Sequence, residues 1–316
     1  MDEDRDLPET LPERAFTESL ETFFPTDDRA VLGLGDDGAI LRRGDSDLVL
    51  CCDPVVADRH FLATDPLHAV GQKAVARNLS DLAAMGARPE GLLISVLLPE
   101  GTTESARDEL FRGLRDAAVA SNSIVLGGDT GSTSGPLTVT VTAIGRVAGR
   151  VLTRTGASVG DEIWISGPVG GSGLRRGGGL PRHLRIDPRM ALGLELSEHR
   201  YVRAVLDVSD GLALDLWTLC RASGVPGAEI DADSIPIHVD ASDAAEGSGR
   251  SALEHALEDG EDHELLIAAS PGADLANLGA YRLGVLTEDD GILLRQGDAP
   301  RERLRIRGYQ HGGSAR

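Results

Sequence analysis

Five short acidic motifs, each containing or adjoining small residues, are spread along the first two thirds of the chain. They are Gly35-Asp36-Asp37, Cys51-Cys52-Asp53, Asn78-Leu79-Ser80-Asp81, Gly127-Gly128-Asp129-Thr130 and Asp207-Val208-Ser209-Asp210-Gly211. We expect each motif to lie where a strand or loop meets a helix or turn. Magnesium is usually held by a few carboxylates together with the phosphates of a substrate. The motifs therefore predict a cation-bridged polyphosphate site, and nucleotide-dependent phosphoryl chemistry is the leading hypothesis.

The charge of the chain agrees with such a site. The formal net charge is −20, and Lys73 is the only lysine among 31 basic residues. Nucleic-acid binding needs a basic face, so we expect no nucleic-acid partner. Phosphorylated substrates would also be repelled unless cations intervene, which again indicates Mg²⁺. The acid excess predicts a halophilic source. A GC-rich genome, which exchanges Lys for Arg, is the alternative, but it does not explain the acid.

Length and composition narrow the class of protein. A chain of 316 residues suggests two domains, each large enough for its own core. Aromatic residues are only 3% of the chain, so the cores must consist mainly of Leu, Val, Ile and Ala. No stretch approaches the ~20 apolar residues of a membrane span, and the acidic start is not a signal peptide. Three cysteines make no disulfide framework. We expect a soluble, cytoplasmic protein with no membrane partner.

The elements that position these motifs alternate between strand and helix in the first half of the chain. After a helical lead-in over residues 1–30, the patterns predict strands at Asp47–Cys52, Gly91–Leu98 and Leu137–Arg146, and helices at Pro66–Met85 and Glu104–Ala120. Within the first of these helices, Lys73, Arg77 and Asp81 lie four residues apart on one face, beside an apolar stripe. This face could bring charged groups to the site.

The character of the chain changes near residue 150, so we expect domains over residues 1–150 and 151–316. The second half predicts strands at Glu162–Ser166, Glu264–Ala268, Arg282–Leu286 and Ile292–Arg295, another strand ending at Asp207, and helices at Pro188–His199 and Asp210–Ser223. Asp240–Arg250, rich in Ser, Gly and Asp, is predicted as a surface loop. The glycine run Gly167–Gly179 lacks the Lys-Ser/Thr of a P-loop, so we interpret it as a loop that closes over a ligand.

Four of the motifs, in this order, resemble those of the thiamine-monophosphate kinase family, part of the superfamily that includes aminoimidazole ribonucleotide synthetase. The most specific runs from Lys73 to Pro89, KAVARNLSDLAAMGARP, and is followed by GGDT at 127–130, DVSDGL at 207–212 and GEDHEL at 260–265. The resemblance covers about residues 33–309. His60-Phe61, the segment 150–154 and the Gly-Tyr-x-His ending at His311 favour the thiamine phosphate branch.

The resemblance implies an α+β fold whose N-terminal domain binds ATP and metal and forms a barrel-like sheet with its twin in a homodimer. It implies phosphorylation of thiamine phosphate to thiamine diphosphate by direct in-line transfer from ATP, assisted by several Mg²⁺ ions. A related ATP-dependent synthetase acting on a phosphorylated ribonucleotide is one alternative, and a non-catalytic nucleotide-binding dimer is another. The attacking phosphate oxygen is already ionised, so we expect no nucleophilic side chain and no Ser-His-Asp or Cys-His constellation.

The resemblance also assigns the site residues. The metal ligands would be Asp37, Cys51, Cys52, Asp53, Asp81, Asp129, Asp207 and Asp210, with Asp36 assisting. The ATP contacts would be Gly128, Asp129, Arg154 and Ser209, and the thiamine phosphate contacts would be His60, Glu261 and Tyr309. Several have structural alternatives: a solvated turn at Asp37, an ion pair at Asp81, and an N-cap at Ser209 or Asp210.

The chain departs from the family pattern at two places. The residues before Asp53 are usually hydroxyl-bearing, whereas here they are Cys51 and Cys52, and thiols are poor partners for Mg²⁺. Contacts through backbone carbonyls would be unaffected, but contacts through hydroxyls would weaken one cation site. Inert buried cysteine is the alternative to a redox role. At the C-terminal end, Gln310 and Gly312 replace an Asp and a final aromatic residue, which puts the acceptor pocket in question.

Overall fold

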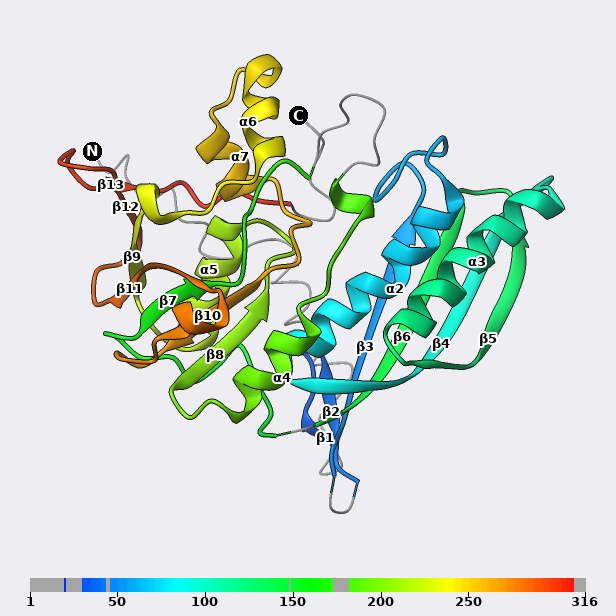
Figure 1. The fold of residues 1–316 in the computed structure, drawn as a ribbon, viewed down its shortest axis with the longest axis horizontal. Helices are drawn as coiled ribbons and strands as arrows, with labels where there is room; N and C mark the ends of the chain where they lie inside the picture. Colours follow the sequence, from blue (N-terminus) through cyan, green and yellow to red (C-terminus); the bar gives the residue numbers. More distant parts are fainter. Residues whose placement is uncertain (1–19, 21–29, 44–45, 148, 173–181, 310–316) are drawn as a thin grey trace.

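The computed structural model describes residues 20, 30–43, 46–147, 149–172 and 182–309. They form a mixed α+β fold with two sheets, one built before residue 150 and one after it (Figure 1). The expected lead-in helix, most of the glycine run and the ending at His311 lie outside these residues. Within the described ranges, no helix is long and apolar enough to cross a membrane.

The first sheet has six strands in the order β1-β2-β3-β6-β4-β5, and only β4 and β5 pair in parallel. Its strands are β1 (Ala30–Leu32), β2 (Ala39–Leu41), β3 (Leu48–Val56), β4 (Ala87–Pro99), β5 (Ile124–Thr133) and β6 (Thr138–Val147). Side chains alternate between the two faces of a strand, so Val139, Val141 and Ala143 of β6 all point into the core. This buried face packs against two helices.

The two helices are α2 (Leu67–Ala84) and α3 (Glu104–Ala120), which lie side by side on the sheet (Figure 1). Thr103 caps α3 by accepting a hydrogen bond from the backbone N–H of Ala106. A Cβ at Gly113 would lie 2.0 Å from the carbonyl oxygen of His68, so this glycine lets α3 pack closely on α2. The helices therefore hold α2 at a fixed height above the strands.

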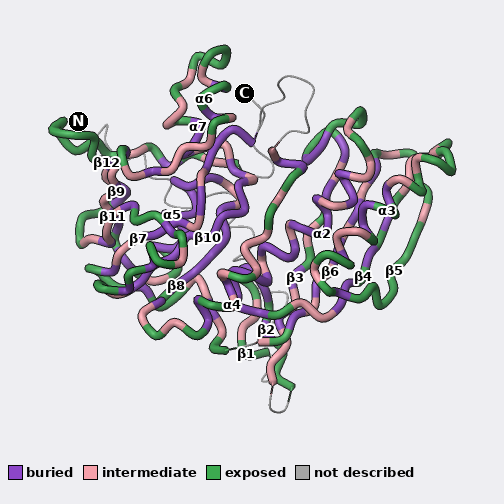
Figure 2. The backbone as a smooth tube through the Cα atoms, in the orientation of Figure 1, coloured by how far each residue is buried: buried purple, intermediate pink, exposed green. Residues whose placement is uncertain are grey.

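The outer edge of the first sheet is open. Ile124, Val125 and Leu126 of β5 are 63%, 52% and 55% exposed, and Leu93 and Leu97 of β4 are also exposed. Figure 2 shows β5 as an exposed strand at the margin of the molecule. The described residues of the single chain close no barrel, so the expected barrel would need a second copy. An apolar edge strand is otherwise prone to pair with other chains.

The second sheet has seven strands in the order β13-β12-β9-β11-β7-β10-β8, with only β9 and β12 parallel. The strands are β7 (Glu162–Ile165), β8 (Val202–Asp207), β9 (Gly227–Asp231), β10 (Leu265–Ala269), β11 (Tyr281–Thr287), β12 (Gly291–Arg295) and β13 (Glu302–Arg303). Helix α5 (Leu212–Ala222) packs on this sheet through a largely aliphatic core. In the β8–β10 pair Asp207 lies opposite Leu265, which brings two of the sequence motifs together.

Helix α4 (Met190–Glu198) joins the two parts by packing against α2. Ala83 and Ala84 of α2 share a buried cluster with Leu196 of α4 and Trp164 of β7. A Cβ at Gly193 would lie 2.1 Å from the carbonyl oxygen of Ala83, so glycine is needed at this contact. Helix α2 thus lies between the first sheet and the second part of the chain.

Most predicted elements are confirmed with small shifts of their ends, but the placement of three aspartates is wrong. Strand β3 continues through Asp53 to Val56, so this residue lies inside a strand and not at its end. Asp129 likewise lies inside β5, which pairs along its length with β4. Asp81 lies in the last turn of α2. Regular structure therefore holds these three carboxylates, with no strand end or turn involved.

The loop predicted at Asp240–Arg250 is also wrong, because α6 (Val239–Ser248) occupies most of it. His238 caps the helix through Nδ1, which accepts from the backbone N–H of Asp240, and Gly249 ends it in the left-handed conformation. Composition suggested a loop, but Ala241 and Ala244 provide a buried face. The remaining elements are α7 (Ala252–Glu258) and short 3₁₀ turns at Arg182–Leu184, Ala232–Ser234 and Leu275–Leu278.

Candidate functional site

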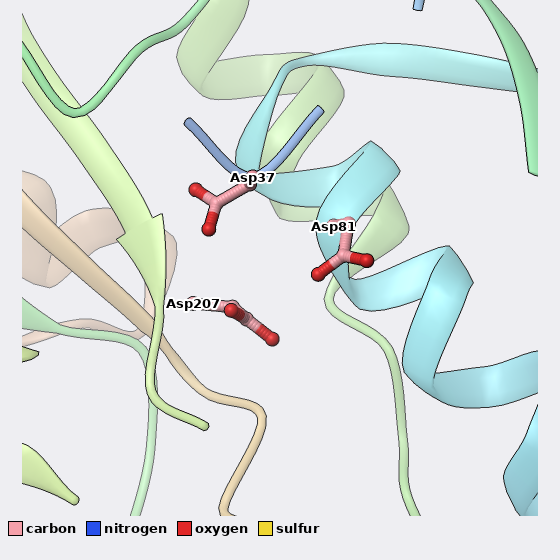
Figure 3. A group of neighbouring side chains, drawn as sticks. All are labelled: Asp37, Asp81 and Asp207. Carbon is pink, nitrogen blue, oxygen red and sulfur yellow. The ribbon is translucent and has the colours of Figure 1, made fainter. Parts of the chain in front are cut away.

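Three carboxylates from distant parts of the chain meet where the two sheets adjoin α2 (Figure 3). Asp37 comes from the turn between β1 and β2, Asp81 from α2, and Asp207 from the end of β8. One ligand oxygen of each lies within 4.8 Å of the others. Like charges this close disfavour ionisation of all three groups. An oxygen-only donor set of this kind suits a hard divalent cation such as Mg²⁺.

Arg154 lies against this carboxylate cluster. Its Nε and Nη2 donate to Oδ1 of Asp37 at 3.1 and 2.5 Å, and its backbone N–H donates to the Asp36 carboxylate at 3.1 Å. The other oxygen of Asp37, Oδ2, is buried and has no hydrogen-bond partner. Burial raises the pKa of Asp37 to about 7, although Arg154 opposes the shift. Asp37 therefore offers one oxygen to a ligand, and Arg154 lies at the cluster.

The other two carboxylates differ in their surroundings. Burial raises the pKa of Asp81 well above its usual value, and the charges of Asp207 and Asp53 raise it further. Burial also acts to raise the pKa of Asp207, but His263 and Ser80 more than offset it, so the net shift is downward. Ser80 Oγ donates to Asp207 Oδ2 at 2.7 Å, and His263 Nδ1 lies 3.0 Å from the same oxygen. Asp207 is thus the member held ionised without a metal.

The charged face predicted on α2 is confirmed, and its members reach different segments. Lys73 Nζ donates to Oε1 of Glu261 at 2.7 Å. One turn later, Arg77 Nη2 donates to Oδ2 of Asp53 at 3.2 Å, and its Nη1 lies 3.6 Å from Glu261 Oε1. Asp81, another turn on, belongs to the carboxylate cluster. One helix face therefore connects the predicted acceptor residue Glu261 to the predicted metal ligands.

A cavity of about 120 Å³ adjoins the Asp207 loop. All three predicted acceptor contacts line it, together with two other predicted residues; its walls are Arg59, His60, Arg77, Ser209, Asp210, Asp259, Glu261, His263 and Tyr309. Pockets for drug-sized ligands usually measure about 300–1,000 Å³, so only part of such a ligand fits here. A larger cavity of about 710 Å³ between α2, α3 and α4 is lined by none of the predicted site residues.

Gly128 and Asp129 do not join the carboxylate cluster. They lie on β5, which β4 and β6 separate from β3 in the sheet. The Asp129 side chain is exposed and accepts a hydrogen bond from the backbone N–H of Thr130 at 2.9 Å. A Cβ at Gly128 would lie 1.7 Å from the carbonyl oxygen of Ile94, so the pairing of β5 with β4 already requires glycine there. Within one chain these two residues form no site with the other aspartates.

The cysteine pair has a structural role in part. Cys51 is buried and its thiol donates to the carbonyl oxygen of Asn78 at 3.2 Å. Burial raises the pKa of Cys51 well above its usual value, and nearby Asp81 raises it further. A protonated thiol is a poor metal ligand. Cys52 is exposed and accepts from the Thr142 hydroxyl at 3.2 Å. Ligation by Cys51 is therefore confined to its backbone oxygen.

Sequence reasoning missed two residues that support the site. Asp215 is buried in α5, and its Oδ2 accepts from the backbone N–H groups of Asp210 and Gly211 at 2.9 and 3.0 Å. This fixes the loop that follows Asp207. A single Asp within an apolar helix stripe was the available signal. His263 stood in a motif that we used for the family resemblance, without any role assigned to it.

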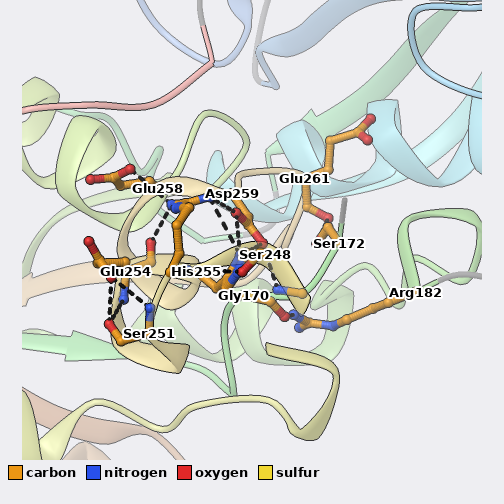
Figure 4. Close-up of polar contacts among 12 residues, drawn as sticks. Gly170, Ser172, Arg182, Ser248, Ser251, Glu254, His255, Glu258, Asp259 and Glu261 are labelled. Atoms are coloured by element: carbon orange, nitrogen blue, oxygen red, sulfur yellow. Dashed lines mark hydrogen bonds and ion pairs between the residues drawn. The ribbon is translucent and has the colours of Figure 1, made fainter. Parts of the chain in front are cut away.

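The described part of the glycine run does not form a phosphate cradle. The backbone N–H of Gly170 donates to Oδ1 of Asp262 at 2.8 Å, and that of Gly171 donates to Oδ2 of Asp259 at 3.1 Å. Both glycines have positive φ, 92° and 85°, which directs the amides toward these carboxylates. Figure 4 shows Gly170 between Arg182 and the Asp259 group. The amides are therefore already occupied by the protein's own acids.

A Ser-His-Asp arrangement does occur, contrary to expectation. Ser248 Oγ lies 2.7 Å from Nε2 of His255, whose Nδ1 lies 2.9 Å from Oδ2 of Asp259 (Figure 4). However, Arg250 donates to Asp259 at 3.0 Å, and its backbone N–H donates to Ser248 Oγ at 3.1 Å. The guanidinium offsets the charge that would polarise the histidine. Because all four residues belong to the α6–α7 hairpin, we interpret this cluster as structural.

Comparison with known sequences gives consistent matches. The family described as "AIR synthase related protein, N-terminal domain" matches residues 35–147. A thiamine-monophosphate kinase of Rhodopirellula baltica is 34% identical over 299 residues, which cover 90% of this chain and 92% of that protein.

Solved structures are similar over nearly the whole fold. One described as "AaThiL complexed with AMPPCP and TMP" has a TM-score of 0.81 at 26% identity and covers 94% of this chain and 96% of its own. The crystal structure of a thiamine-monophosphate kinase from Stenotrophomonas maltophilia has a TM-score of 0.70 at 32% identity and covers 90% and 96%.

Proposed function

This chain belongs to the thiamine-monophosphate kinase family, and from that premise we propose how its residues act. The enzyme transfers the γ-phosphoryl group of ATP to thiamine phosphate, giving ADP and thiamine diphosphate. The observation that supports this reaction most directly is the cluster of Asp37, Asp81 and Asp207 beside the cavity lined by Glu261 and Tyr309. A phosphoryl transfer between two polyanions needs both a cation site and an acceptor pocket.

Magnesium is the cation that the cluster suits. The donor atoms are carboxylate oxygens, and Asp37 Oδ2 is buried without a partner, which leaves a ligand position on the protein side. Asp37, Asp81 and Asp207 would hold the ions, with Asp53 beside them and Asp210 on the following loop. Bound Mg²⁺ neutralises phosphate charge and polarises the transferred group. The number of ions that this set holds under turnover is several, as the number of aspartates suggests.

The acceptor binds in the cavity beside the Asp207 loop. His60 and Glu261 lie on its wall and Tyr309 closes one side, where its ring can stack on or line the pocket for the thiamine moiety. The carboxylate of Glu261 is 28% exposed, so part of it faces solvent or ligand. Thiamine phosphate carries a positively charged ring, which a carboxylate at this position stabilises.

The residues of the chain bind and orient, and none of them attacks. The nucleophile is a phosphate oxygen of the acceptor, ionised at neutral pH, so no general base is required for in-line transfer. Arg154 exchanges Asp37 for the nucleotide phosphates, because a guanidinium binds two oxygens at once. Ser209 contacts the nucleotide from the loop after β8. Catalysis then depends on alignment and on neutralising charge.

Two copies associate through the open edge and face of the first sheet in this proposal. The support is the exposed apolar surface of Ile124, Val125 and Leu126 on an edge strand. In such a dimer Gly128 and Asp129, which lie apart from the cluster in one chain, reach nucleotide and metal bound to the other copy. The domain boundary near residue 150 separates this dimerising part, residues 1–150, from residues 151–316.

The dimer has its own test. Sedimentation analysis should give twice the chain mass of 33.2 kDa, and Leu126→Glu should shift the protein to the single-chain mass. Val119→Glu, on the exposed surface of α3, is the matched control and should leave the mass unchanged. A wild-type protein that sediments as a single chain at micromolar concentration would remove the dimer from the proposal.

Product identification tests the reaction. Purified protein incubated with ATP, MgCl₂ and thiamine phosphate should form thiamine diphosphate and ADP in equal amounts, as measured by chromatography. Asp207→Asn should abolish formation of both products, while its circular dichroism spectrum stays that of the wild type. ATP consumption without thiamine diphosphate would indicate a different acceptor, and no consumption would favour a non-catalytic protein.

A further inference from the structure

The only lysine of the chain is fully buried. Lys73 has a side-chain exposure of 0%, although lysine is almost never buried without partners. Its Nζ donates to the backbone oxygen of His60 at 2.6 Å and to Oε1 of Glu261 at 2.7 Å. It also lies 3.0 Å from Nδ1 of His183. An ammonium group has three donors, so these contacts satisfy it completely.

The three partners come from separate segments. His60 follows β3, His183 lies in the 3₁₀ turn before α4, and Glu261 lies in the loop before β10. Two of them, His60 and Glu261, line the acceptor cavity, whereas Lys73 does not line it. Lys73 is therefore placed behind the pocket wall and joins two residues of that wall.

The backbone around Glu261 is unusual and needs support. Glu261 and His263 both have φ of 53°, a left-handed conformation that costs energy for residues other than glycine. The backbone N–H groups of these residues donate to Ser209 and Val208 carbonyl oxygens at 2.7 and 2.8 Å. These bonds hold the loop from the side of β8, and Lys73 holds the Glu261 carboxylate from the side of α2 (Figure 4 shows this side chain directed away from Gly170).

The choice of lysine at this position is itself informative. Every other basic residue of the chain is arginine, so the general preference of the sequence is overridden here. A compact ammonium reaches three acceptors at 2.6–3.0 Å, whereas a planar guanidinium is wider and distributes its donors in a fork. The geometry of the three partners thus requires a point-like cation.

We propose that Lys73 is a positioning residue of the acceptor site, which sets the affinity for thiamine phosphate by fixing the Glu261 carboxylate and the His60 backbone. It does so without touching the acceptor. This inference rests on the proposed function and extends it to a residue that no acceptor contact identifies. Arg77 supports the same carboxylate from 3.6 Å but is shared with Asp53.

Steady-state kinetics with both substrates varied test the proposal. Lys73→Met keeps the approximate length and removes the charge; it should raise the KM for thiamine phosphate at least about tenfold, with the KM for ATP within about twofold of wild type. His68→Gln is the control, because it breaks another interaction of α2, the contact of His68 with Asp116 at 2.9 Å. It should leave both constants unchanged.

A double-variant cycle separates positioning from general damage. In a Glu261→Gln background, Lys73→Met should raise the KM for thiamine phosphate less than about threefold further, because the group that Lys73 positions has already lost its charge. This comparison also serves if Lys73→Met alone does not fold, since the double variant leaves no unpaired carboxylate at position 261. Calorimetric titration of thiamine phosphate in the presence of a non-hydrolysable ATP analogue should show the same pattern.

Three outcomes would overturn the inference: an unchanged KM for thiamine phosphate in Lys73→Met, equal rises in both KM values, or fully multiplicative effects in the double variant. Each requires an active wild-type enzyme. A wild-type protein without thiamine phosphate kinase activity would instead refute the proposed function, so the two failures are distinguishable.

Discussion

Replacing Asp81 by asparagine tests whether the carboxylate cluster binds metal. Asparagine keeps the size of the side chain and most of its hydrogen bonding but removes the charge. Two unit charges at 4.8 Å, the spacing limit of the cluster, repel by about 3 kcal/mol at an effective dielectric constant of about 20. The raised pKa values of Asp37 and Asp81 mean that protonation already relieves part of this repulsion at neutral pH. The metal-free variant should therefore gain only about 1–2 kcal/mol, or a few degrees in Tm.

Turnover should change in the opposite direction. A neutral amide is a weaker Mg²⁺ ligand and leaves phosphate charge uncompensated, so we expect a loss of at least about 100-fold in kcat. Mg²⁺ should raise the Tm of the wild type, since it binds only the folded site, and this rise should largely disappear in the variant. Asp53→Asn should lose turnover similarly. Asp129→Asn, outside the cluster, should lose turnover without changing metal-free stability.

The assay is turnover against Mg²⁺ concentration, with thermal melts in EDTA and in Mg²⁺. Asp108→Asn, an exposed carboxylate on α3, is the control and should match the wild type in all three measurements. An Asp81→Asn protein that melts early in EDTA yet keeps near-normal turnover and Mg²⁺ dependence would show that the aspartate is structural. The reaction centre would then have to be sought elsewhere.

The acceptor pocket, one buried carboxyl group and the surface charge each give a further prediction. Glu261→Gln and Tyr309→Ala should raise the KM for thiamine phosphate much more than that for ATP, and equal rises would mean that the acceptor site is misplaced. Burial raises the pKa of Asp262 to about 7, so the folded state binds its proton more tightly and stability should fall as pH rises from about 4 to about 7. Asp262→Asn should flatten this part of the curve of unfolding free energy against pH, and parallel curves would contradict it. Molar KCl, where the Debye length is ~3 Å, should be required for folding and activity; full activity and an unchanged Tm in ~50 mM salt would refute a halophilic source.

Local signals in the sequence were sufficient for the helices that carry the site. The bounds predicted for α3, Glu104–Ala120, coincide with those of the structure, because the Thr103 cap and the apolar spacing are both local. Helix α2 was predicted within one residue at each end for similar reasons. The spacing of Lys73, Arg77 and Asp81 followed directly from the helix. What depended on period and capping was therefore predictable.

Elements that depend on distant partners were not predictable. The sequence of β5, IVLGGDTGST, is rich in Gly, Ser and Thr and looks like a loop, and only its parallel pairing with β4 makes it a strand. The contact between Lys73 and Glu261 joins residues 188 positions apart, and no local pattern indicates it. The same holds for Ser80 and Asp207, which are 127 positions apart. Motifs nominated the residues, and only the fold shows which of them meet.

Helix α2 relates the two halves of the site by its geometry. An α-helix rises 1.5 Å per residue, so Lys73 and Asp81 are about 12 Å apart along its axis, with Arg77 midway. The first supports the acceptor residue Glu261, the second contacts both Glu261 and Asp53, and the third belongs to the carboxylate cluster. In-line transfer requires reacting atoms to be held about 3–3.5 Å apart, which loops on separate domains achieve poorly. Because Gly113 and Gly193 lock α2 between α3 and α4, the distance from acceptor to metal is set by a rigid element. This accounts for the most specific motif of the chain being a helix.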